Sequence, residues 1–204
     1  MTTRNMLQEL CRYNIGTFAN IIYRNAILYP DREAFVCGEE RITFSRFNIR
    51  VNNLIHALHD MGVRKGDVIG IISWNCLEYA DVYGAAMKGG FIVSPFNPRL
   101  RADELDYIIN YSEATTLFIG PELLDMANTL KPRLPRVKNF ISLEIPSPGM
   151  IDHHDLLAAH RDQEADIPID EADPVCIIYT SGTTGVPRGA LYTQRRFIED
   201  SKTC

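Results

Sequence analysis

The sequence predicts an α/β fold in which a mainly parallel sheet is layered with flanking helices. Short apolar runs that suit buried strands alternate with longer segments whose apolar residues repeat at helical spacing. Glycines stand where the first two of these helical segments end. The chain has 204 residues, 46% of them hydrophobic, which is enough for one sizeable domain or two small ones.

The first predicted helix runs from Thr43 to Met61, where the apolar side chains fall on one helical face. Thr43 is a suitable N-cap and Gly62 a suitable end. The following run, 68–74, is predicted as a buried parallel strand because it is short and apolar on both faces.

A second helix is predicted from the N-cap Asn75, with Glu78 completing a capping box, to the pair Gly89 and Gly90. The alternation then continues along the chain. Further strands are predicted at 91–96, 115–120, 138–144, 174–181 and 189–192, and further helices at 103–111, 122–130 and from 194 onward.

Three parts are predicted along the chain. Residues 1–144 form an amino-terminal α/β subdomain, 145–174 an acidic connecting segment, and 175–204 the start of a second subdomain. The connection is expected to run over the surface, with at most a helical turn or two at 155–160. It holds eight acids and one arginine, a charge of −7 out of a total of −5, so the remainder sums to +2. No broad basic face for nucleic acid is therefore expected.

The five cysteines are scattered and form no C-x-x-C pair, so neither a disulfide framework nor a zinc site is indicated, and a cytoplasmic location fits them best. Residues 1–14 lack the apolar core and cleavage site of a signal peptide. No membrane span is predicted, because no run of about 18 apolar residues is present.

Residues 179–192, YTSGTTGVPRGALY, combine glycines and hydroxyl side chains between two apolar runs. Glycines let successive backbone N–H groups converge on one anion, and hydroxyls can donate to phosphate oxygens or ligate hydrated Mg²⁺. Arg188 adds a fixed charge that fits two phosphate oxygens. Neither G-x-x-x-x-G-K-[ST] nor G-x-G-x-x-G is present, and composition alone leaves a plain surface linker as the alternative. The candidate phosphate-binding residues are Thr180, Ser181, Gly182, Thr183, Thr184, Gly185, Pro187, Arg188 and Gly189.

The order of these residues closely resembles the signature [YF]-T-S-G-[ST]-T-G-x-P-K-G of the adenylate-forming enzymes, with ten of eleven positions matched and Arg188 at the usual lysine. The resemblance covers about residues 30–200, and SPFNPRLRADEL is similar to the acyl- and aryl-CoA ligase branch. It implies the incomplete amino-terminal part of that superfamily's large domain.

The resemblance implies ATP, Mg²⁺ and CoA as ligands and a small carboxylic acid, fatty or aryl, as substrate. Family members activate the carboxylate as an acyl-adenylate, and the CoA-ligase branch transfers the acyl group to CoA. The loop would hold the β- and γ-phosphates, whereas the family's catalytic lysine lies in a later domain. We therefore expect an inactive amino-terminal portion of an acyl-CoA ligase, able to self-associate through its uncompleted core surface. The alternatives are a non-catalytic nucleotide-binding module or an adenylation domain of another branch.

A few other residues have simpler expectations. His153 and His154 lie between aspartates, the residue types of a metal site, but adjacent histidines in an acidic connection are expected to point into solvent. Trp74 and Tyr79 flank a strand-to-helix turn of the kind that borders ligand crevices, and core packing is expected for both. Cys176 is expected to be inert core, whereas no role is predicted for Gln194, which stands where many relatives have histidine.

Overall fold

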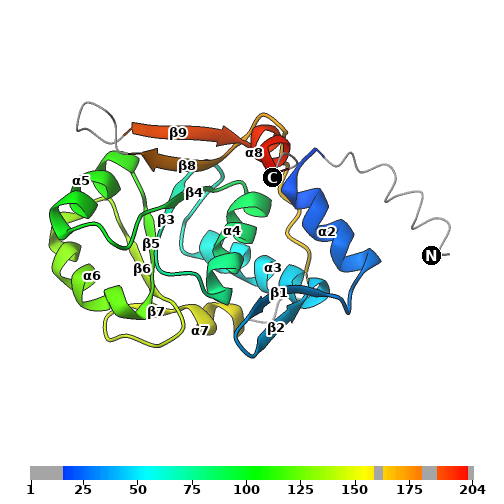
Figure 1. Ribbon diagram of the computed structural model, residues 1–204, viewed down its shortest axis with the longest axis horizontal. Coiled ribbons are helices and arrows are strands. Elements are labelled where there is room, and N and C mark those ends of the chain that lie inside the picture. Colours follow the sequence, from blue (N-terminus) through cyan, green and yellow to red (C-terminus); the bar gives the residue numbers. More distant parts are fainter. Residues whose placement is uncertain (1–15, 159–162, 181–187, 202–204) are drawn as a thin grey trace.

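A computed structural model describes residues 16–158, 163–180 and 188–201 (Figure 1). Its main sheet has the order β7-β6-β5-β3-β4-β8-β9, and every neighbouring pair is parallel except the hairpin β8–β9. The strands are β3 (Val68–Ile72), β4 (Ile92–Pro95), β5 (Thr116–Ile119), β6 (Asn139–Ser142), β7 (Ile151–Asp152), β8 (Pro174–Thr180) and β9 (Arg188–Thr193). The predicted α/β class with a mainly parallel sheet is confirmed.

Helices cover both faces of this sheet (Figure 1). They are α2 (Phe18–Leu28), α3 (Phe44–Asp60), α4 (Leu77–Gly89), α5 (Ala102–Ser112), α6 (Leu124–Leu130), α7 (His153–Ala158) and α8 (Gln194–Ser201), with 3₁₀ turns at Pro121–Leu123 and Lys131–Arg133. One hydrophobic core joins α2, α3 and α4 to the sheet, and a second joins α5 and α6 to it. The chain leaves β3 toward β4 on one side and leaves β5 toward β6 on the other, so the carboxyl ends of β3 and β5 form the topological switch point.

The ends of α3 follow the sequence expectation, whereas the start of α4 does not. Thr43 Oγ1 accepts a hydrogen bond from Arg46 N at 3.3 Å, and Gly62 adopts φ +88° just beyond the helix. The N-cap of α4 is Cys76, which makes no side-chain capping bond. Asn75 was therefore misplaced as the cap, and no capping box forms with Glu78, because the chain stays extended one residue longer.

The acidic connection is more structured than expected, because it contributes the edge strand β7 and is bonded to α3. Asn48 and Asn52 both donate to Glu164, at 3.0 and 2.9 Å, and Ala165 N donates to Asn52 Oδ1 at 3.3 Å. Beyond it, β8 joins the main sheet through the pairing of Val93 with Cys176. The division into three parts stays a prediction.

The sequence reading missed α2 and the antiparallel pair β1 (Glu33–Cys37) and β2 (Glu40–Thr43), which forms a separate two-stranded sheet. Figure 1 shows α2 beside α8, at the end of the β8–β9 hairpin. None of the helices within the described ranges combines the length and apolar character needed to cross a membrane.

Candidate functional site

The candidate phosphate-binding loop joins β8 to β9. The two strands pair antiparallel to their ends, with Thr180 opposite Arg188 and Tyr179 opposite Gly189. Thr180, Arg188 and Gly189 are thus placed together, whereas Ser181, Gly182, Thr183, Thr184, Gly185 and Pro187 lie outside the described residues. The loop starts and finishes at adjacent positions of a closed hairpin, where Thr180 and Arg188 are both exposed.

This hairpin places Thr180 and Arg188, which flank the loop in the sequence, at the carboxyl edge of the parallel sheet. β8 runs parallel to β4, so Thr180 lies at the edge where β3, β4 and β5 also end. Ligands of such sheets bind outside the carboxyl ends of the strands. Tyr179 anchors the root of the loop: its ring stacks on Phe96 at 6.2 Å between centroids and meets Tyr111 edge-on at 6.3 Å. Burial raises the pKa of Tyr179, so the phenol stays neutral.

Gly189 has a packing reason to be glycine that the sequence motif alone does not reveal. A Cβ at this position would lie 2.8 Å from Ile177 Cγ2 and 3.1 Å from Tyr179 Cε1. These contacts are shorter than carbon atoms tolerate without displacement. The hairpin therefore needs glycine here to keep the two side chains against its own backbone.

Gln194 holds the far end of the hairpin. Its side chain is fully buried, and its Oε1 accepts from Phe18 N, at the start of α2, at 3.1 Å. Its Nε2 donates to Met87 O, in the last turn of α4, at 2.8 Å. One amide thus satisfies an unpaired donor of one helix and an unpaired acceptor of another.

The chain segments that follow β3 and β5 lie against one another. A Cβ on Gly120 would lie 2.5 Å from Ser73 Oγ and 3.1 Å from Ser73 Cα, so the chain segments that follow the two strands touch. Trp74, the next residue after Ser73, is 44% exposed, and the Arg99 guanidinium lies 5.3 Å from its ring centroid. Core packing was the wrong expectation for Trp74, because the ring faces a cation at the sheet edge. Tyr79 packs against the core, as expected.

The adjacent histidines do not both face solvent. His153 is fully buried and its Nε2 lies 3.1 Å from Asp81 Oδ2, whereas His154 is exposed and 3.3 Å from Glu78. Arg50 Nη2 contacts the same Asp81 oxygen at 2.5 Å. Within the part of the chain that the structure describes, no cluster of three or more His, Cys, Asp or Glu side chains is arranged to hold a metal. The buried contacts of His153 bind α7 to α4.

Burial and hydrogen bonding set the ionisation of two core groups. Burial alone would raise the pKa of Asp81, but hydrogen bonds from His153 and Arg50 outweigh it, so this pKa is lowered. Burial raises the pKa of Cys176 to about 12. Because the thiolate is the reactive form, Cys176 is inert core, as expected.

Known proteins similar to this chain were found by sequence and by structure. A medium-chain-fatty-acid–CoA ligase from Ectopseudomonas oleovorans is 30% identical over 170 residues, covering 80% of this chain and 31% of that protein. A 3-methylmercaptopropionyl-CoA ligase from Ruegeria lacuscaerulensis is 33% identical over 152 residues, covering 70% of this chain and 28% of its own length. The chain thus spans about a third of the length of these curated relatives.

Solved structures that share the fold of this chain were also found. A protein from Rhodopseudomonas palustris assigned as a long-chain-fatty-acid CoA ligase superposes with a TM-score of 0.83 at 31% identity, covering 92% of this chain and 47% of that one. An anthranilate CoA ligase in complex with anthranoyl-AMP, at 22% identity and a TM-score of 0.85, shares the fold over 91% of this chain and 36% of its own. Residues 22–204 match the family described as AMP-binding enzyme. The chain belongs to the AMP-binding enzyme family.

Proposed function

We propose that this chain is the phosphate-holding part of an ATP-dependent acyl-CoA ligase. The observation that carries the proposal is the hairpin, whose paired ends Thr180 and Arg188 flank the glycine- and hydroxyl-rich segment and lie at the carboxyl edge of the sheet. The similarity to two curated CoA ligases supports the reaction class. A carboxylic acid is the proposed substrate, and ATP, Mg²⁺ and CoA are the proposed partners in the reaction.

In this proposal the loop acts on the leaving group. When a carboxylate oxygen attacks the α-phosphorus of ATP, the bond to the bridging oxygen breaks and negative charge collects on the departing pyrophosphate. Donors that bind the β- and γ-phosphates more strongly as that charge grows lower the barrier. Each such donor contributes about 1–3 kcal/mol.

The residues at the ends of the loop and within it have different roles in this proposal. Arg188 balances negative charge without giving up a proton, because guanidinium stays protonated at any physiological pH. Thr180 and the hydroxyls of Ser181, Thr183 and Thr184 would donate to phosphate oxygens or hold the hydrated Mg²⁺ that accompanies ATP. The glycines Gly182 and Gly185 would let backbone N–H groups approach the same oxygens.

The complete reaction is proposed to need more residues than this chain contains. Support comes from the relatives, of which the chain spans about 31% in the first case. The catalytic lysine and most of the acid-binding pocket would lie in the remaining part. The scattered cysteines support a cytoplasmic location for the protein, and self-association of the isolated chain is a further prediction.

A paired measurement tests this division of labour. We expect the 204-residue chain to bind MgATP in isothermal titration calorimetry, yet to show no octanoate-dependent exchange of labelled pyrophosphate into ATP. Failure to bind MgATP would contradict the phosphate-binding role. Exchange at an enzymatic rate would instead contradict the claim that further residues are required.

A further inference from the structure

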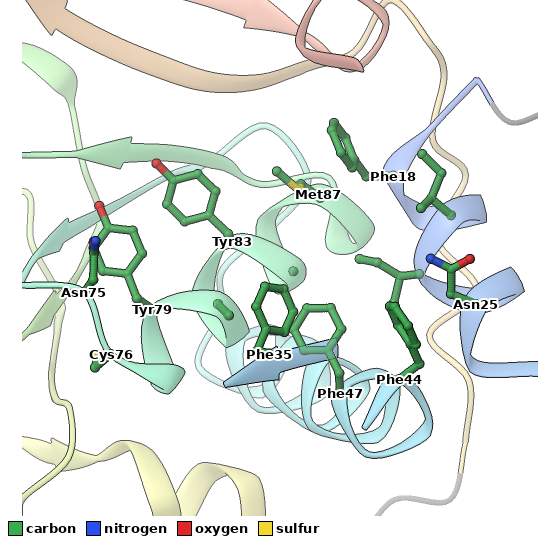
Figure 2. A pocket seen from close by; sticks show the side chains of 14 residues that line it. Phe18, Asn25, Phe35, Phe44, Phe47, Asn75, Cys76, Tyr79, Tyr83 and Met87 are labelled. Carbon is green, nitrogen blue, oxygen red and sulfur yellow. The ribbon is translucent and has the colours of Figure 1, made fainter. Parts of the chain in front are cut away.

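A large cavity lies among α2, β1, α3 and α4 (Figure 2). Its volume is about 500 Å³. Six aromatic side chains form most of the wall: Phe18, Phe35, Phe44, Phe47, Tyr79 and Tyr83. This volume falls within the range of about 300–1,000 Å³ that is typical of small-molecule sites.

The aromatic rings of the wall contact one another in pairs. Phe35 and Phe47 meet edge-on at 4.8 Å between centroids, and Tyr79 stacks on Tyr83 at 5.3 Å with 20° between the ring planes. Gly84 fixes how closely α3 and α4 approach, since a Cβ there would lie 2.5 Å from Val51 Cγ2. The positions of the aromatic rings are therefore set by contacts with one another and by the packing of α3 against α4.

The wall is apolar and carries no charge. None of its described lining residues is Lys, Arg, His, Asp or Glu. Its polar groups are two asparagines, the Cys76 thiol and two phenols, and burial raises the pKa of Tyr79 and of Tyr83, so both phenols stay neutral. Figure 2 shows the phenol oxygens and Asn75 toward the left of the cavity and Asn25 toward the right, with hydrocarbon between them.

We propose that this cavity is a binding site for an uncharged ligand with a hydrocarbon body and one hydroxyl or carbonyl group. The hydrocarbon body would replace water along the aromatic wall, and the single polar group would pair with a phenol or an asparagine amide. A carboxylate or an amine is disfavoured, because no opposite charge lines the wall to offset its desolvation. The inference does not rest on the proposed function.

A titration with aliphatic alcohols tests the site directly. Met87 lines the cavity, so a ¹³C label on the methionine methyl groups reports binding at this position by NMR. We expect 1-hexanol and 1-octanol to shift the Met87 methyl signal saturably, with affinity rising about fourfold for each added methylene. Octanoate at neutral pH is expected to bind more weakly than 1-octanol. Absence of a saturable shift, or tighter binding of octanoate, would overturn the proposal.

Variants show whether the ligand occupies the cavity itself. Ala80→Phe fills the space from α4, and Ile21→Phe fills it from α2, so each is expected to weaken 1-octanol binding at least about tenfold. Ala158→Phe makes the same chemical change on the exposed side of α7 and should leave the affinity unchanged. If a folded Ala80→Phe or Ile21→Phe variant binds 1-octanol as tightly as the original chain, the proposed site is contradicted. One of the two variants is enough for this test if the other fails to fold.

One alternative occupant has a distinct signature. If the original chain shows no saturable binding but a version lacking residues 1–15 does, the chain's own amino-terminal segment fills the cavity. That result would overturn the ligand-site proposal.

Discussion

Gln194 Nε2 donates to the carbonyl oxygen of Met87 at 2.8 Å, inside a fully buried contact between the start of α8 and the last turn of α4. The same side chain accepts from Phe18 N.

Gln194→Leu would leave one buried donor and one buried acceptor unpaired, and we expect the free energy of unfolding to fall by about 2–4 kcal/mol. Urea denaturation measures this. The neighbouring, exposed Arg195→Leu is the control and should change stability by no more than about 0.5 kcal/mol. An equal loss of stability in both variants would show that the Gln194 amide does not stabilise the fold.

Asp81 predicts how stability depends on pH. Its pKa is below the ordinary value of 3.8, since the hydrogen bonds from His153 and Arg50 outweigh burial. A carboxyl with a lowered folded-state pKa stabilises the fold above its unfolded pKa, and this contribution is lost as the pH falls through the folded pKa. Stability should therefore decline below about pH 4 more steeply in the original chain than in Asp81→Asn. Asp125→Asn, an exposed site, should keep the steep profile, and identical profiles for all three proteins would contradict the assignment.

Lys88 and Glu164 predict an asymmetric pair of substitutions. Lys88 is 2% exposed and bonds Glu164 and Asn48, whereas the Glu164 side chain is 38% exposed. Glu164→Leu leaves the buried Lys88 ammonium without its carboxylate partner and should lower the free energy of unfolding by about 3 kcal/mol. Lys88→Met leaves a carboxylate that can turn toward water and should lower it by about 1 kcal/mol. Burial already lowers the pKa of Lys88 despite its partner. Thermal and urea denaturation of both variants decide the order, and a larger loss for Lys88→Met would be contrary to this account.

Gly189 separates packing from phosphate binding. Gly189→Ala places a Cβ against Ile177 and Tyr179, and we expect a loss of about 1–2 kcal/mol in stability without any ligand present. Adding Ile177→Ala removes the Cγ2 atom in the shorter contact, so the two changes should be less than additive in a double-mutant cycle. Strict additivity would mean that the steric contact is not the reason for glycine.

The regular part of the fold follows from local patterns in the sequence. The apolar face and Thr43 cap of α3 are local signals, and the run Val68–Ile72 is apolar on both faces because helices cover both sides of the sheet. These features depend on local periodicity and on the capping side chain. The fold class and the alternation of strands and helices were therefore predictable.

What the sequence did not reveal depends on contacts between distant segments. His153 is buried because Asp81, on another helix, accepts its hydrogen bond, and no local pattern identifies that partner. Gln194 likewise finds Phe18 and Met87 far away in the chain. The packing role of Gly189 arises only once β9 pairs with β8.

The affinity of the chain for MgATP tests the central claim most directly. Thr183 and Thr184 are proposed to donate to the phosphates, so replacing both with valine, which keeps their shape but removes the hydroxyls, should weaken MgATP binding at least about tenfold. Thr129→Val, on the exposed side of α6, should leave the affinity unchanged in the same calorimetric titration. An unaltered affinity in the doubly substituted, folded chain would contradict the proposal that this loop holds the triphosphate.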